Sequence, residues 1–116
     1  MPNKALVAAS TKPLVLSILA YGKNYGYRII QEVERLSEGE LEWTDAMLYP
    51  VLKRMEKEQL ITSHWVKTPN GRKRKYYEIT PTGREQLAED RRQWQRVTQT
   101  FTRLWDQTTN PLSLTD

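Results

Sequence analysis

The basic residues of the chain are concentrated in one segment, and their chemistry suits a phosphate-binding surface. Between Lys53 and Lys75 the sequence has eight basic residues and two acidic ones, whereas the rest of the chain has 10 basic and 12 acidic residues. The net charge of +4 is therefore the sum of a strongly basic segment and a slightly acidic remainder of the chain. Because nucleic acids are polyanions whose phosphates attract lysine and arginine, this distribution predicts a surface that contacts nucleic acid.

Residues that could support catalysis or metal binding are scarce. The chain has no cysteine and one histidine, His64, which argues against a thiolate nucleophile, a disulfide framework and a clustered metal site. It also has neither a Gly-x-Ser-x-Gly elbow nor a Gly-x4-Gly-Lys phosphate loop. We therefore expect a protein that is not an enzyme, needs no metal or other cofactor, and carries His64 on its surface.

An apolar run near the N-terminus is too short to cross a bilayer. Lys12 and Pro13 interrupt it, and no stretch approaches the roughly 20 apolar residues that a membrane helix needs. A chain of 116 residues is also too short for two domains of ordinary size. We therefore expect a cytoplasmic protein with one folding unit.

Apolar residues at helical spacing predict two helices before the basic segment. The run 14–20 follows Ser10 and Thr11, which can cap a helix, and it ends before Gly22. The stretch 25–36 is amphipathic, because its apolar residues recur every three or four positions among charged ones. The first helix is expected to be mostly buried, and the second to bury one face.

A third helix is expected to begin the basic segment. Thr44 or Asp45 can cap it, because either side chain can accept the free N–H groups of the first turn. Its apolar stripe includes Leu48 and Leu52. Pro50 lies within this helix, where a proline costs least in the first or second turn.

Two segments that favour β-structure flank a turn signal and predict a hairpin. Residues 60–67 and 75–80 are rich in β-branched and aromatic side chains, and Asn70 and Gly71 lie between them. The loop carries several of the basic residues, and loops run over the surface. Its cations should therefore project into solvent, while Trp65 should cover the hairpin.

A long helix is expected from Thr82 to about Gln107, because no proline interrupts this stretch. Large apolar residues recur along it at coiled-coil spacing, on a face that a small domain cannot bury alone. A second copy of the chain is the natural partner. The residues expected at this dimer interface are Leu87, Trp94, Val97, Phe101, Leu104 and Trp105. Trp43 and Trp105 are expected to serve packing.

The order of three helices, a hairpin and a long helix predicts a mainly α fold with a small β-hairpin. This is a winged helix-turn-helix, in which the third helix enters the major groove of DNA and the hairpin is the wing. The expected division is a DNA-binding domain over 1–80, a dimerisation helix over 81–107 and a flexible tail over 108–116. The residues expected to contact DNA are Thr44, Asp45, Met47, Tyr49, Lys53, Arg54, Lys57, Asn70, Gly71, Arg72, Lys73, Arg74 and Lys75.

Three sequence blocks resemble the PadR family of transcriptional regulators. They are YGYRIIQEV in the second helix, TDAMLYPVLKRMEKEQLI around the third, and RKRKYYEITPTGREQL from the wing into the last helix. The resemblance covers roughly residues 6 to 106, and Leu-Tyr-Pro in the third helix is a family feature. Gln59 departs from the family, since many members have glycine where the third helix turns into the first wing strand.

Because the long helix is the last element, the chain is similar to the family's short subgroup of multidrug-binding repressors. The block DRRQWQRVTQTF resembles the corresponding helix of that subgroup, with Trp94 at the tryptophan that stacks on planar drugs between two subunits. The resemblance implies a flat aromatic effector, neutral or anionic as readily as cationic. The residues it implies for the ligand site are Leu6, Ala9, Lys12, Pro13, Trp94 and Thr98.

The sequence thus predicts a homodimeric repressor that binds a pseudo-palindromic double-stranded DNA operator and is released by an aromatic small molecule. The alternative is an architectural or RNA-binding winged-helix protein that responds to no effector. A protein–protein adaptor is a weaker alternative, and it would show no salt-dependent binding to DNA.

Overall fold

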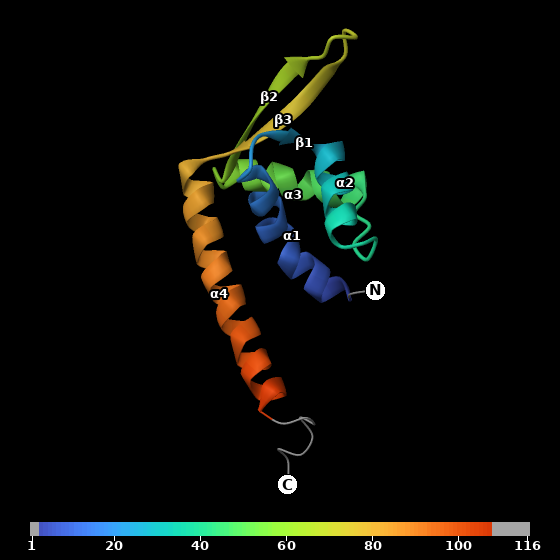
Figure 1. Ribbon diagram of the computed structural model, residues 1–116. Helices are drawn as coiled ribbons and strands as arrows, with labels where there is room; N and C mark the ends of the chain where they lie inside the picture. The colour runs from blue at the N-terminus through green and yellow to red at the C-terminus, as the bar shows by residue number, and fades with distance from the viewer. Residues whose placement is uncertain (1–2, 108–116) are drawn as a thin grey trace.

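A computed structural model describes residues 3–107 of the chain (Figure 1). Its elements are α1 (Lys4–Leu19), β1 (Asn24–Tyr25), α2 (Gly26–Leu36), α3 (Asp45–Lys57), β2 (Ile61–Lys67), β3 (Lys73–Ile79) and α4 (Pro81–Asp106). Helices α1 to α3 form the body, the β2–β3 hairpin projects from one end, and α4 runs past the other. The predicted winged helix-turn-helix, mainly α with a small hairpin, is confirmed. The predicted flexible tail over 108–116 lies outside the described residues.

Helix α1 is longer than the sequence suggested. It begins at Lys4, and the side chain of Asn3 caps it by accepting the N–H of Leu6 at 2.9 Å. The expected start near Ser10 and Thr11 is therefore wrong. The helix passes through Pro13, which lacks an N–H but does not break the helix. No helix over residues 3–107 has both the length and the apolar character to cross a membrane.

The sheet has one strand more than the predicted hairpin. Strands β2 and β3 pair antiparallel from Ile61 opposite Ile79 to Lys67 opposite Lys73. The two-residue strand β1 pairs with the other edge of β3, with Tyr25 opposite Tyr76. A strand of two residues has no periodicity that a sequence can display. Its pairing holds the start of α2 against the base of the wing.

The core is built from one apolar face of each helix and from the base of the wing. Its fully buried side chains are Val15, Leu16, Leu19, Ile29, Leu48, Leu52, Met55 and Ile61. Burying one such side chain stabilises the fold by about 1.5–3 kcal/mol. Trp43 is also buried in the core, as expected.

The junction between the wing and α4 is anchored on the link between α3 and β2. The hydroxyl of Thr80 accepts the N–H of Gly83 at 2.9 Å and donates to the Gln59 or Leu60 carbonyl, at 2.7 and 3.0 Å. Gln59 itself has a φ of +63°, a left-handed conformation that glycine adopts at less cost. This geometry explains why the family's usual glycine at this position suits the turn.

Candidate nucleic-acid interface and effector groove

Helix α3 presents a polar face opposite its buried stripe. Thr44 caps it, with its hydroxyl accepting the N–H of Met47 at 3.2 Å, which decides between the two candidate caps. Leu48, Leu52 and Met55 are buried beneath it. The residues exposed on the outer side of the helix are Asp45, Ala46, Tyr49, Pro50, Lys53, Arg54 and Lys57.

One of the residues predicted on this surface, Met47, lies on its flank. Met47 is partly buried against the core, and it lines a hollow with Arg54 and Lys12 between α3 and α1. Ala46 was missed, because a small apolar residue carries no charge signal. Its position on the exposed side could have been found from helical geometry alone.

Tyr49 joins α3 to the beginning of α2. Its ring lies over Gly26 so closely that a β-carbon on this glycine would be 2.6 Å from the Tyr49 hydroxyl. Burial, and after it the charge of Asp45, raises the pKa of Tyr49 above its ordinary value. Part of the Tyr49 ring remains exposed. Tyr49 therefore packs against α2 and is also accessible on the outer face of α3.

The wing tip is an ordered turn around the predicted Asn-Gly pair. The N–H of Gly71 donates to the Thr68 carbonyl at 2.9 Å, and the Asn70 side chain accepts the N–H of Arg72 at 3.3 Å. Gly71 has a φ of +85°, which favours glycine. The turn holds Arg72 and Lys73 exposed at the end of the hairpin.

The four wing cations fall into two pairs. Arg72 and Lys73 are exposed, and within residues 3–107 no ion pair involves either of them. By contrast, the Arg74 guanidinium lies 4.4 Å from the centre of the Tyr25 ring, and the Lys75 ammonium lies 3.7 Å from a Glu56 carboxylate oxygen. The tip pair is therefore available for another molecule, while the second pair also stabilises the wing.

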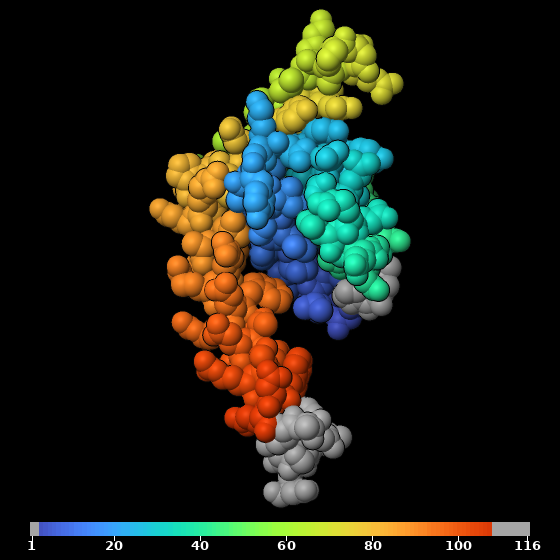
Figure 2. Space-filling model, viewed as in Figure 1, coloured from blue at the N-terminus to red at the C-terminus, as the bar shows by residue number. Residues whose placement is uncertain are grey.

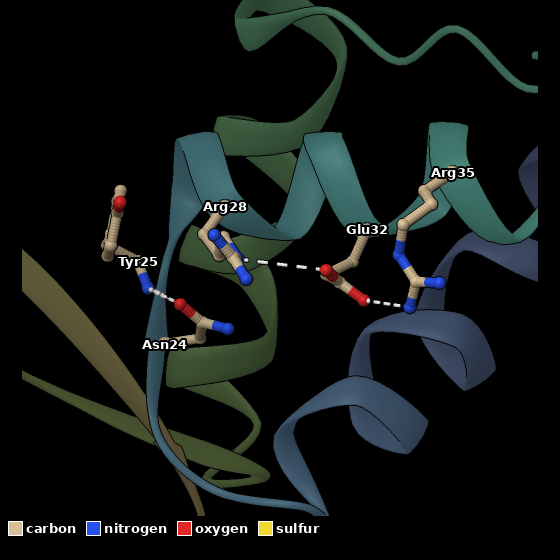
Figure 3. A network of polar contacts seen from close by, with 5 residues as sticks. All are labelled: Asn24, Tyr25, Arg28, Glu32 and Arg35. Carbon is tan, nitrogen blue, oxygen red and sulfur yellow. Dashed lines mark hydrogen bonds and ion pairs between the residues drawn. The ribbon is translucent and has the colours of Figure 1, made fainter.

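The charged residues on α2 interact among themselves. The Glu32 carboxylate lies 2.8 Å from Arg35 and 3.7 Å from Arg28, and the hydrogen bond from Arg35 lowers the pKa of Glu32 (Figure 3). Beside them the Asn24 side chain accepts the N–H of Tyr25 at 3.1 Å. Arg28 and Arg35 are thus paired within α2, unlike Arg72 and Lys73 at the wing tip.

An apolar groove of about 520 Å³ opens between α1 and α4 (Figure 2). It brings together three of the six predicted ligand residues, Leu6, Pro13 and Trp94. Ala9, Lys12 and Thr98 do not line it. The Lys12 ammonium binds the Glu58 carboxylate at 2.9 Å on the side facing α3, so within this chain Lys12 is directed away from the groove.

Beyond the groove, α4 extends past the body of the molecule (Figure 1). This part of the helix carries an exposed apolar stripe. Its side chains are 40–58% exposed, and the rings of Phe101 and Trp105 stack with centroids 5.0 Å apart. The stripe consists of Trp94, Val97, Phe101, Leu104 and Trp105. Leu87, predicted as part of the same stripe, is instead 9% exposed in the chain's own core, because the first turns of α4 pack on α1.

A winged helix-turn-helix with a basic helix face and a basic wing defines a DNA-binding protein. The family model of the PadR-like transcriptional regulators matches residues 15–89. The chain belongs to this family, and it is accordingly a DNA-binding transcriptional regulator.

The chain is similar to individual proteins over most of their length. A protein of Lysinibacillus sphaericus is 30% identical over 97 residues, which cover 84% of this chain and 89% of the relative. The crystal structure of a PadR-like transcriptional regulator from Bacillus cereus is 30% identical, with a TM-score of 0.78 over 89% of this chain and 98% of the other. A PadR family regulator from Eggerthella lenta is 28% identical, with a TM-score of 0.72 over 90% and 88%.

Proposed function

We propose that the protein is a cytoplasmic, homodimeric repressor that binds a pseudo-palindromic DNA operator and leaves it when a planar aromatic molecule binds. The observation that carries the DNA-binding mode is the continuity of two basic surfaces. Lys53 and Lys57 of α3 line the same hollow as Lys75 of the wing. A duplex can therefore meet both elements at once.

Each surface has a distinct task in this proposal. The first turns of α3, with Asp45, Ala46 and Tyr49, lie in the major groove and contact base edges, where an alanine methyl suits a thymine methyl. Lys53 and Lys57 bind phosphates, which position the helix without reading sequence. The remaining contacts come from the flanks and the wing, through Thr44, Met47, Arg54, Asn70, Gly71, Arg72, Lys73, Arg74 and Lys75.

The exposed stripe of α4 supports a homodimer. A contiguous apolar surface of this kind on a soluble protein marks an interaction site, and its coiled-coil spacing suits a second helix of the same type. Two-fold symmetry would present two copies of α3 to successive major grooves. The operator half-sites should then lie roughly 10 base pairs apart.

The groove between α1 and α4 supports an effector site. Its lining is mainly apolar, and Trp94 supplies an aromatic face on which a flat ligand can stack. Since α4 is anchored on the end of α3 through Thr80, a ligand that moves α4 also moves the recognition helix. Ligand and DNA would then change each other's affinity by the same factor.

The test of the DNA-binding mode is a salt series of fluorescence anisotropy titrations with a labelled duplex. Replacing both Arg72 and Lys73 by alanine should weaken binding and lower the slope of log affinity against log salt by up to about 2 units. The matched control is Arg28→Ala together with Arg35→Ala, which removes two cations from α2. An unchanged slope for the wing variant would contradict the mode, and preference for an RNA duplex would favour the alternative function.

A further inference from the structure

Trp65 is a large aromatic side chain on the wing, and it is 64% exposed, whereas Trp43 is 6% exposed. The expectation that Trp65 covers the hairpin is therefore wrong. Trp65 lies directly opposite Lys75 in the antiparallel pair, so both side chains leave the same face of the hairpin. Because side chains alternate along a strand, Lys67 and Lys73 share this face too.

The aromatic residues on the other face of the hairpin are already paired. His64 stacks on Tyr76 at 6.4 Å between ring centroids, and Tyr76 also meets the edge of Tyr25 at 5.4 Å. Among residues 3–107, no ring stacks on Trp65 in this way. The indole is thus presented to solvent on the face that also carries the cations.

This face of the wing is continuous with the outer side of α3. One hollow is lined by Lys53, Lys57 and Lys75, and an adjoining one by Trp65, Lys73 and Lys75, with Tyr49 and Tyr77 in both. We call the two hollows together the α3–wing groove. Its lining includes one carboxylate, Glu56, which accepts the Ser63 hydroxyl at 2.7 Å and pairs with Lys75. Basic side chains outnumber this carboxylate, so the groove suits an anionic occupant.

We propose that one sugar–phosphate strand of duplex DNA passes through the α3–wing groove, with the Trp65 indole packed on a deoxyribose and Lys75 bound to the adjoining phosphate. The inference rests on the proposed DNA-binding mode. With α3 in a major groove and the wing at the neighbouring minor groove, the strand that separates the two grooves must pass between them. Both the position of the groove and its charge therefore favour a DNA strand as its occupant.

The chemistry of such a contact differs from that of the cations. A deoxyribose is common to every nucleotide, so the indole adds affinity on all sequences and reads none of them. An apolar contact displaces no counterion, so it does not change the dependence of affinity on salt. A lysine that binds a phosphate changes both the affinity and its dependence on salt. The two kinds of contact can thus be separated in one set of titrations.

The first experiment compares Trp65→Ala with wild type on a labelled duplex of mixed sequence over a range of salt. Binding should weaken by roughly tenfold, the effect of losing about 55 Å² of buried apolar surface, at an unchanged salt slope. Lys75→Gln should lower the slope by about 1 unit. His64→Ala, which alters the neighbouring residue on the opposite face, should bind as wild type does, and Trp65→Phe should retain most of the affinity.

The second experiment follows the indole directly. In a variant with Trp94→Phe and Trp105→Phe, Trp43 is buried, so acrylamide should quench mainly Trp65. Saturating DNA should shield Trp65 from the quencher. Full quenching in the complex, or wild-type affinity of Trp65→Ala, would overturn the proposal while salt-dependent binding by wild type still stood. Absence of DNA binding by wild type would instead reject the proposed function as well.

Discussion

The α-carbon of Gly83 lies directly against the carbonyl oxygen of Leu60, and a β-carbon on this glycine would be 2.1 Å from that oxygen. The same carbonyl accepts the N–H of Thr80 at 3.0 Å. The beginning of α4 is therefore pressed onto the link that leaves α3. Only a residue without a side chain allows this approach.

Replacing Gly83 by alanine should destabilise the protein, because the clash involves backbone that cannot rotate away. We expect a loss of about 2–3 kcal/mol in the free energy of unfolding, as for an overpacked core, measured by urea denaturation. Glu85→Ala, on an exposed position of the same helix, is the control and should change stability by less than about 0.5 kcal/mol. Equal stability of Gly83→Ala and wild type would show that the two segments separate easily.

Replacing Phe101 by aspartate should dissociate the proposed dimer, because it places a charge in the centre of the α4 stripe. Sedimentation at micromolar concentration should change from a dimer to the 13.7 kDa monomer. Gln99→Asp, which introduces the same charge on the other side of the helix, should remain dimeric. A monomeric wild-type protein would reject the interface altogether.

Replacing Trp94 by alanine should remove most of the affinity for flat aromatic ligands, since its ring lines the groove and is the stacking surface of the proposed effector site. Titration calorimetry with proflavine and with naphthalene sulfonate measures this and also reports the preferred ligand charge. The dimer and its affinity for DNA should be retained, because the other four side chains of the stripe remain and no charge is introduced. Trp105→Phe, outside the groove, should bind ligand as wild type does. If Trp94→Ala and wild type bound ligand with equal affinity, Trp94 would serve only packing.

Stability should decrease at alkaline pH because of Tyr77. Burial, with a smaller contribution from Glu56, raises the pKa of Tyr77 to about 12, whereas an unfolded tyrosine ionises near pH 10, at roughly its ordinary pKa. The unfolded state therefore loses this proton first, and stability falls between these values by up to about 1.4 kcal/mol per pH unit.

Urea denaturation across this range should show a smaller decrease for Tyr77→Phe. Tyr21→Phe, at a side chain that is 96% exposed, should follow wild type. If Tyr77→Phe and wild type lost stability in parallel, the alkaline transition would belong to other groups.

Local pattern was sufficient to predict the winged helix-turn-helix. The stripe of Leu48 and Leu52, the turn at Asn70 and Gly71 and the charge of the hairpin are each set by neighbours within a few residues. Periodicity and turn chemistry act over that range. The candidate recognition face and the exposed α4 stripe followed from the same local signals.

Tertiary packing alone decided how these elements meet. The pairing of Tyr25 with Tyr76, the burial of Leu87 against α1 and the direction of Lys12 toward Glu58 each depend on residues distant in sequence. Helix α1 continues through Pro13 although an interior proline costs about 3 kcal/mol, and the Asn3 cap on one side and the core packing of Leu16 and Leu19 on the other act against that cost. The α3–wing groove likewise exists only because the hairpin face of Trp65 folds beside α3, and no spacing along a single strand could reveal that.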